Sequence, residues 1–232
     1  MTKGYYQYFT EGWKYFCSHP QPAFQDALTF LSNEKADFVL ITEIDGGSAR
    51  SSSVNQVEAI RTSLEGHAVF FPTTRYGKRY NQGNAIISRY PILSSLQHEL
   101  PGRGEKRFLG EAKIKTDEGE IDLFVTHLSL SKTVRILQFE AIKKIIQEKT
   151  GPVILGGDLN THEAVEKKVL MENLFSHAVT APTYPSWNPK KYLDFILLTD
   201  HFHIKKVGVY AGVQFSDHIP LVCEAGVAGL PI

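Results

Sequence analysis

Short aliphatic runs recur along the chain, separated by polar and glycine-rich stretches. Most of them are strand-length and bounded by Gly, Pro, Asp or Asn, a pattern that predicts buried β-strands. They cover residues 37–44, 67–72, 83–88, 121–130, 152–158, 193–199 and 219–224. Residues 111–116 (EAKIKT) alternate apolar and polar positions instead, which predicts a half-exposed strand. Asp117, Glu118 and Gly119 then predict a hairpin turn into the following strand.

Between the strands, apolar residues at helical spacing predict four helices. The first follows Pro22 and carries Phe24, Ala27, Leu28 and Leu31. The second carries Val57, Ile60 and Leu64, with Ser53 as its N-cap. The third presents Val134, Leu137, Ala141 and Ile145 on one face and stops at Gly151-Pro152, and the fourth covers about 163–174. This mixture of strands, helices and a hairpin predicts a single α/β domain over residues 1–232, layered and not purely parallel.

The composition is that of an ordinary globular protein. Among 232 residues, 42% are hydrophobic, and 25 Lys+Arg balance 25 Asp+Glu to a formal net charge of +0. This balance excludes intrinsic disorder and disfavours a protein that coats DNA with a globally basic surface. Two cysteines are too few for a disulfide scaffold, and no apolar run is long enough for a secretory signal or a membrane span. We expect free thiols, a cytoplasmic location and a monomer.

Acids, amides and histidines fall repeatedly at the ends of the aliphatic runs. They are Glu43, His127, Asp158, Asn160, Asp194, Asp217 and His218. Any one of them has an ordinary explanation, because a carboxylate beside a strand is commonly a turn residue and a lone histidine is commonly a hydrogen-bonding residue. Several at the ends of separate strands indicate a convergent site on a rigid sheet. Clustered carboxylates need a compensating cation, and Mg²⁺ or Mn²⁺ with oxygen ligands is the natural one.

In their order, these motifs resemble the endonuclease/exonuclease/phosphatase superfamily of metal-dependent phosphoesterases. The matching segments are ADFVLITEID, GNAIISRYPI, FVTHLSL, GGDLN, YLDFILLT and SDHIPLV, and the resemblance runs over residues 25–224. GGDLN is the most specific segment, and TYPSWNPKKYLDFI resembles a pattern found in small bacterial members. The resemblance implies a four-layer α-β-β-α sandwich, in which two mixed sheets lie face to face with helices outside.

The resemblance also implies a metal site and a water-activating group. Glu43 would bind the Mg²⁺ or Mn²⁺ that polarises a phosphoryl oxygen and stabilises the leaving oxygen, and Asp217 would ligate the same ion or a second one. Asp158 would orient or deprotonate the attacking water. Asn160 would hold the phosphate or that water, and Asn84 would face the site.

Two histidines complete the implied chemistry. His218, oriented by Asp194, would donate hydrogen bonds to the phosphoryl oxygens, because a carboxylate fixes the ring of a neighbouring imidazole. His127 would protonate the leaving group or bind phosphate. The ordinary alternative for Asp194 and His218 is a buried ion pair with no catalytic part.

The beginning of the chain departs from the superfamily's pattern. Members begin with a strand that ends in an Asn beside the metal, whereas residues 1–21 hold no apolar run ending in Asn. The aromatic stretch from Tyr5 to Trp13 resembles the loop that follows such a strand. We therefore expect the sandwich to lack this first strand, either because the chain begins late or because the protein tolerates the loss. Unpaired backbone groups would then remain in one sheet.

The sequence says less about the substrate. Arg75 and Arg79 lie in an acid-free segment, 73–82, and residues 101–107 and 185–192 are also rich in bases. We expect Arg75 and Arg79 to bind substrate phosphate, although solvated loop charge is the ordinary alternative. The leading hypothesis is hydrolysis of a small or lipid-derived phosphoester. A Mg²⁺-dependent nuclease, with nucleic acid as its partner, comes second, and a non-catalytic domain that binds a phosphorylated ligand comes third.

Overall fold

The computed structural model describes residues 21–161, 174–213 and 215–227. The helix expected at about 163–174 and the expected loss of a first strand before residue 21 therefore lie outside the described residues. The helices are α2 (Gln21–Glu34), the short 3₁₀ helix η2 (Ala49–Ser51), α3 (Gln56–Ser63) and α4 (Lys132–Ile146). No described helix has the length and the apolar content needed to cross a membrane.

Eleven strands make up the described β-structure. They are β1 (Phe38–Asp45), β2 (His67–Tyr76), β3 (Tyr80–Ser88), β4 (Ile92–Leu100), β5 (Arg107–Thr116), β6 (Gly119–His127), β7 (Val153–Asp158), β8 (His177–Val179), β9 (Asp194–Leu198), β10 (Phe202–Val209) and β11 (Leu221–Val227). Every predicted strand is present, and the turn at 117–118 joins β5 to β6 as expected. Strands β4, β8 and β10 have no counterpart in the prediction.

The strands form a six-stranded sheet, a three-stranded sheet and a two-stranded ribbon. The six-stranded sheet has the order β4-β5-β6-β7-β9-β8, and β6 and β7 run parallel within it, so this sheet is mixed as expected. The three-stranded sheet, β1-β3-β2, is antiparallel throughout, and β10 and β11 form the ribbon. In the described residues, β1 therefore has β3 as its one neighbouring strand, and β11 has β10.

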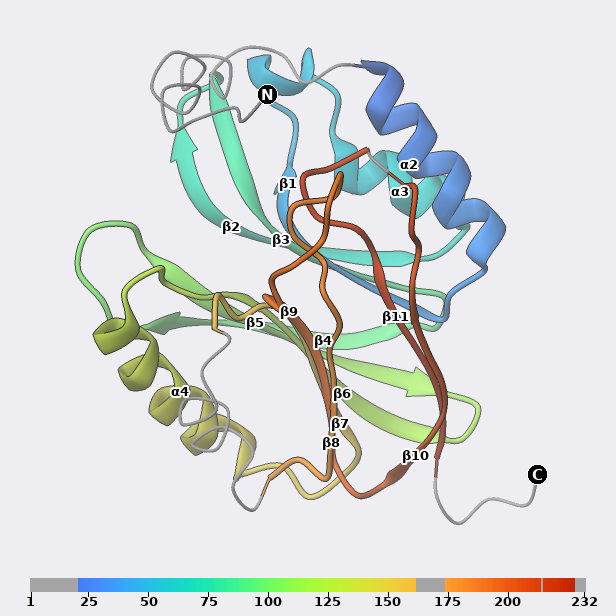
Figure 1. Cartoon of the computed structure of the whole chain (residues 1–232), viewed down its shortest axis with the longest axis vertical. Coiled ribbons are helices and arrows are strands. Elements are labelled where there is room, and N and C mark those ends of the chain that lie inside the picture. The colour runs from blue at the N-terminus through green and yellow to red at the C-terminus, as the bar shows by residue number, and fades with distance from the viewer. Residues whose placement is uncertain (1–20, 162–173, 214, 228–232) are drawn as a thin grey trace.

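Figure 1 shows the layers from top to bottom. Helices α2 and α3 cover the outer face of the three-stranded sheet, which lies over the six-stranded sheet, and α4 covers the far side of the latter. Three apolar clusters fill the spaces between these layers. The alternation of side chains along a strand explains them, since Ile86 packs between the sheets while Ala85 and Ile87 pack under α3. The predicted α/β sandwich is thus confirmed.

Two details of the predicted helices were wrong. The N-cap of α3 is Asn55, whose side chain accepts a hydrogen bond from the Glu58 amide, rather than Ser53. On α4, Leu137 is 53% exposed, and the buried residues are Arg135, Gln138, Phe139, Ile142 and Ile146. Arg135 and Gln138 occupy the buried face because they hydrogen-bond the backbone of the loops at 129–130 and 101. Polar residues with a structural role shifted the buried face away from the purely aliphatic pattern.

Candidate active site

The ends of β6, β7 and β9 bring three of the expected site residues into register. His127 lies opposite Asp158 in the parallel pair, and Asp158 lies opposite Asp194 in the antiparallel pair. All three therefore lie side by side at the edge of the six-stranded sheet where β6 and β7 end. His218 follows on the segment that leads into β11, and its Nε2 is 4.0 Å from Asp158 Oδ2.

The glycines of GGDLN are required by this geometry. Gly157 has φ 137°, and a Cβ there would lie 2.0 Å from the backbone oxygen of Thr126 on the neighbouring strand. At Gly156, the residue before Gly157, a Cβ would lie 2.4 Å from Leu40 Cδ1 of the facing sheet. The two glycines thus allow Asp158 to lie tight between β6 and the three-stranded sheet.

Asp194 and His218 form a close pair. His218 Nδ1 is 2.7 Å from Asp194 Oδ2, and the hydroxyl of Thr183 donates a second hydrogen bond to the same oxygen. Burial opposes a charge on His218, but the bond to Asp194 and the nearby carboxylates outweigh it and raise the pKa of His218 to about 9. The imidazole is therefore a cation at neutral pH, with Nδ1 committed to Asp194 and Nε2 directed to the Asp158 side.

Asp158 is buried and carries a perturbed carboxyl group. Burial, together with the neighbouring Asp194, raises the pKa of Asp158 to about 7, although His218 and the Asn160 amide oppose the rise. The Asn160 N–H donates to Asp158 Oδ1 at 2.8 Å, and Asn160 Nδ2 donates to Leu128 O at 2.9 Å. Asn160, with φ 52°, thereby fixes the orientation of Asp158 and ties its loop to the end of β6.

His127 lies between the carboxylates of two sheets. Its Nε2 is 3.7 Å from Asp158 Oδ2, and its Nδ1 is 3.5 Å from Glu43 Oε1 on β1. Burial and the positive charges of Arg107 and His218 lower the pKa of His127 to about 3. A neutral imidazole offers one N–H donor and one lone pair to a bound group.

Glu43 is the contribution of the three-stranded sheet. Its side chain is 55% exposed, so it faces the opening of the site, and Asn84 on β3 is buried opposite the same stretch of β1. Desolvation and the charge of Asp217 raise the pKa of Glu43, while Arg107 and Arg50 act in the opposite direction. Glu43 and Asp217 are thus close enough to repel, which is a situation that a bound cation relieves.

Two sets of residues have the chemistry to hold a metal ion. Ligand atoms of Asp158, Asp194 and His218 lie within 4.8 Å of one another. Asp194 Oδ2 in that set already accepts hydrogen bonds from His218 and Thr183, which favours a carboxylate–imidazole pair over a metal cage. Glu43 and Asp217 offer oxygen ligands at the open side of the site, and oxygen ligands suit Mg²⁺ and Mn²⁺.

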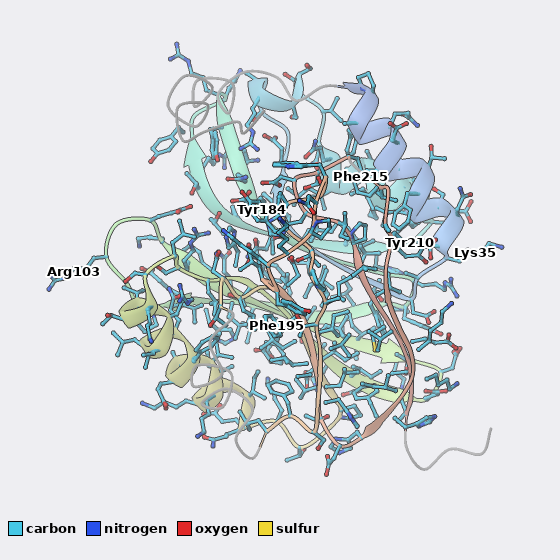
Figure 2. The ribbon with its side chains drawn as sticks, viewed as in Figure 1. Lys35, Arg103, Tyr184, Phe195, Tyr210 and Phe215 are labelled. Atoms are coloured by element: carbon cyan, nitrogen blue, oxygen red, sulfur yellow. The ribbon has the colours of Figure 1, made fainter. Side chains whose placement is uncertain are left out.

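The expected substrate arginines are placed differently. Arg75 and Arg79 are exposed on the hairpin of β2 and β3, and no described hydrogen bond or ion pair joins them to the site carboxylates. Arg107, at the start of β5, is nearly buried, pairs with Glu105 at 2.8 Å and acts electrostatically on both Glu43 and His127. Figure 2 shows Arg103, on the preceding loop, extending away from the sheets.

The loop after β8 adds contacts from the segment TYPSWNPKKYLDFI, whose residues before Asp194 the sequence analysis placed in a family-like pattern without giving them a role in the site. The ring of Tyr184, labelled in Figure 2, packs against His218 with centroids 5.0 Å apart, and Lys191 Nζ lies 5.2 Å from the centre of the same ring. The Ser186 amide donates to Asp217 O at 2.7 Å, which ties this loop to the site. The motif marks Thr183 and Tyr184 in the sequence, but their contacts with Asp194 and His218 depend on the fold.

Comparison with known proteins identifies relatives of this arrangement. The chain matches the profile of the Endonuclease/Exonuclease/phosphatase family over residues 18–218. A sequence search of curated proteins finds no match. Among solved structures, the human Nocturnin catalytic domain with bound sulfate is 18% identical and has a TM-score of 0.71, with 92% of each chain covered.

Two bacterial structures show the same likeness. An endonuclease/exonuclease/phosphatase from Bacteroides vulgatus is 18% identical with a TM-score of 0.71, covering 91% of this chain and 95% of that one. The mannosyl-6-phosphatase Bt3783 of Bacteroides thetaiotaomicron is 16% identical with a TM-score of 0.69, covering 88% and 91%. At these identities the likeness establishes the fold.

Proposed function

Because the chain belongs to the endonuclease/exonuclease/phosphatase family, we propose that it is a divalent-metal-dependent phosphoesterase that hydrolyses a small or lipid-derived phosphoester. The observation that carries the proposal is the convergence of Glu43, His127, Asp158 and His218 from both sheets, within 4.0 Å from one to the next. Nucleases and phosphatases both break phosphoester bonds, so the family supports the reaction class.

Glu43 and Asp217 would hold the metal, Mg²⁺ or Mn²⁺, on the open side of the site. When bound, such an ion polarises a phosphoryl oxygen and stabilises the negative charge of the leaving oxygen. Support comes from the raised pKa of Glu43, whose first cause is desolvation and whose second is the nearby charge of Asp217. Oxygen ligands of this kind match the preference of hard divalent cations.

Asp158 would accept the proton of the attacking water. A base works best when its pKa lies near the working pH, and the pKa of Asp158 is raised to about 7. The Asn160 amide fixes the direction of the Asp158 carboxylate. The side-chain amide of Asn160 uses one hydrogen in its bond to Leu128 O, and its second hydrogen is the donor that we assign to the phosphate or the water.

The two histidines would bind the oxygens of the phosphoester. His218, a cation held by Asp194, would donate from Nε2 to the phosphoryl oxygens as their charge grows. His127 has a pKa lowered to about 3, which supports binding of a phosphoryl or leaving oxygen over donation of a proton. Asn84 and Arg107 would border the phosphate from β3 and β5.

The test is hydrolysis of bis-p-nitrophenyl phosphate with and without Mg²⁺, followed by phosphate release from sugar 6-phosphates. We expect metal-dependent turnover that falls about 10²-fold or more in His218→Ala and in Asp158→Ala. Matched controls are His203→Ala and Asp200→Ala, because both residues lie on or near β10, away from the site. Near wild-type turnover by either site variant contradicts the assignment, and a chain without any metal-dependent hydrolysis favours the non-catalytic binding domain.

The hairpin of β2 and β3 favours a nuclease as the second candidate. Arg75, Lys78 and Arg79 are exposed there, and Tyr76 is 70% exposed beside them. Positive charge interleaved with an exposed aromatic ring is typical of surfaces that bind single-stranded nucleic acid. Nicking of a supercoiled plasmid that weakens in Arg75→Ala/Arg79→Ala, with unchanged hydrolysis of the small diester, would support this candidate.

A further inference from the structure

The backbone of Glu43 is held in an unusual conformation. Its φ is 59°, in the left-handed region that residues with a Cβ rarely adopt. Ile41 pairs with Ala85 and Ile44 pairs with Gly83, so two residues of β1, Thr42 and Glu43, lie opposite the single residue between them on β3. The strand therefore bulges at Glu43, and a bulge commonly redirects a side chain next to a functional site.

A chain of hydrogen bonds ends on this bulge. Gln82 Nε2 donates to the backbone oxygen of Glu43 at 3.1 Å, and Gln82 Oε1 accepts a bond from the Tyr80 hydroxyl. The Tyr80 hydroxyl in turn accepts from Arg50 Nη1 at 3.0 Å, and the Arg50 guanidinium also lies 5.1 Å from the centre of the Tyr80 ring. Arg50, Tyr80 and Gln82, which we call the Glu43 relay, connect η2 and β3 to the bulge.

The direction of these bonds is uniform. Each donor points toward Glu43, from a cationic guanidinium through a hydroxyl and an amide to the carbonyl oxygen, so each bond strengthens the next. Arg50 and Gln82 are buried, which keeps water from competing for the same donors.

The chain beyond the bulge is fixed by other bonds. The Gly46 amide donates to Asn81 O at 2.8 Å, and Asn81 Nδ2 donates to Gly46 O at 3.0 Å. Asp45 accepts hydrogen bonds from the amide of Gly47 and the hydroxyls of Ser48 and Ser51. These bonds hold the loop after β1, whereas the relay acts on the carbonyl of Glu43 itself.

We propose that Arg50, Tyr80 and Gln82 are positioning residues that hold Glu43, in its left-handed bulge, for a divalent cation. The inference rests on the proposed function in one respect, the assignment of Glu43 as a metal ligand. The relay acts through the backbone of Glu43. Groups that orient a metal ligand in this way commonly change metal affinity by about 10-fold or more when they are removed.

The experiment compares Tyr80→Phe and Gln82→Met with the wild-type chain. Tyr80→Phe removes a single oxygen and retains the ring, and Gln82→Met removes the donor at similar volume. The matched control is Gln97→Met, because Gln97 Nε2 also donates to a backbone oxygen, that of Pro72, at 2.8 Å on an exposed strand. Thermal unfolding of every variant checks that it is folded.

The main readout is Mn²⁺ binding in the absence of substrate. Electron paramagnetic resonance measures the concentration of free Mn²⁺. We expect the Mn²⁺ dissociation constant to rise about 10-fold in both relay variants and to stay within about twofold in Gln97→Met. The Mg²⁺ concentration for half-maximal hydrolysis should rise in parallel, while kcat at saturating Mg²⁺ changes less. A merely structural role would lower the unfolding midpoint without moving the metal affinity.

The possible results test the relay and the proposed function separately. Wild-type Mn²⁺ affinity in folded Tyr80→Phe and Gln82→Met overturns the relay, whatever the chain hydrolyses. A wild-type chain that binds Mn²⁺ but hydrolyses no phosphoester overturns the proposed function and leaves a 10-fold loss of affinity as support for the relay. A wild-type chain that binds no Mn²⁺ overturns both.

Discussion

His218 Nδ1 lies 2.7 Å from Asp194 Oδ2, and Thr183 donates a hydrogen bond to the same oxygen. The pair joins the start of β9 to the segment before β11, which are far apart in the sequence. Because Asp194 holds both the orientation and the positive charge of the imidazole, the state of His218 depends on a residue that need not touch substrate.

Asp194→Asn is expected to lower turnover about 10²-fold or more, because the amide holds the ring without stabilising its charge. The pKa of His218 should fall from about 9 toward its ordinary 6.5, so the alkaline limb of the pH–rate profile should move to lower pH. The measurement is hydrolysis of bis-p-nitrophenyl phosphate across pH, with Asp200→Asn as control, since the Asp200 side chain is 82% exposed. An alkaline limb that stays in place contradicts the role of the pair.

Under the proposed function, the pH dependence of hydrolysis by the wild-type chain depends on two groups. Asp158 acts as a base when deprotonated, so kcat/KM should rise as pH increases through about 7. His218 acts when protonated, so kcat/KM should fall as pH increases beyond about 9. Raising Mg²⁺ should move the acidic limb to lower pH, because a nearby cation favours the carboxylate form. A profile that is flat from pH 6 to pH 10 would rule out both assignments.

The strained backbone of Glu43 predicts a difference in the free energy of unfolding between Glu43→Gly and Glu43→Ala. Left-handed geometry costs a residue with a Cβ roughly 1–2 kcal/mol, and Gly loses about 0.5–1 kcal/mol more backbone entropy on folding than Ala. The strain is the larger effect, so Glu43→Gly should be more stable than Glu43→Ala by about 0.5–1 kcal/mol. Urea unfolding measures the difference. At the neighbouring Thr42, which has no positive φ, the order should reverse, and the same order at both positions contradicts strain at Glu43.

A buried cluster on the α4 side of the six-stranded sheet makes stability depend on pH. Glu111 lies 2.5 Å from Lys149 Nζ and 2.7 Å from His98 Nε2. Burial raises the pKa of Glu111, but the hydrogen bonds to Lys149 and His98 outweigh it and lower that pKa below 4.5. Since the folded pKa lies below the unfolded one, the stabilisation is complete above about pH 4.5 and is lost as pH falls through the folded value.

Glu111→Gln should therefore lower the free energy of unfolding at pH 7 by about 2 kcal/mol, because two charge-assisted hydrogen bonds are weakened. The loss should shrink when unfolding is measured at lower pH. Glu118→Gln, on the exposed turn between β5 and β6, is the control and should leave the unfolding free energy nearly unchanged. An equal loss at pH 7 and at pH 3 would show that packing, rather than charge, is responsible.

The sequence predicted the strands whose side chains are buried and missed those that are exposed. Strands such as β6 and β7 read as continuous aliphatic runs, because both faces of the sheet are covered. Strand β4 is an edge strand with Leu93 and Leu96 more than half exposed, and β10 exposes Val207, so neither shows a clear run. The three-residue β8 is too short to give any periodic signal.

The site was predictable as far as its residues stand at strand ends. Glu43, Asp158 and Asp194 follow or begin aliphatic runs, and the fold brings them together as that position suggests. Gln82 was missed, and Thr183 and Tyr184 were noticed only as part of a motif, because their roles lie in contacts across 11 to 39 positions of the chain that local pattern does not encode. Arg75 and Arg79 were singled out by charge alone, which does not tell whether an arginine faces the site.

Gly156 is the point at which the two sheets touch beside the site. A Cβ at residue 156 would lie 2.4 Å from Cδ1 of Leu40. Leu40 is three residues before Glu43 on β1, and Gly156 is two residues before Asp158 on β7. The missing methyl group thus allows β1 and β7 to lie close together, and with them Glu43 and Asp158. A larger residue at position 156 would either displace the Leu40 side chain or push β1 away from β7, and the second outcome would lengthen the distance between Glu43 and Asp158.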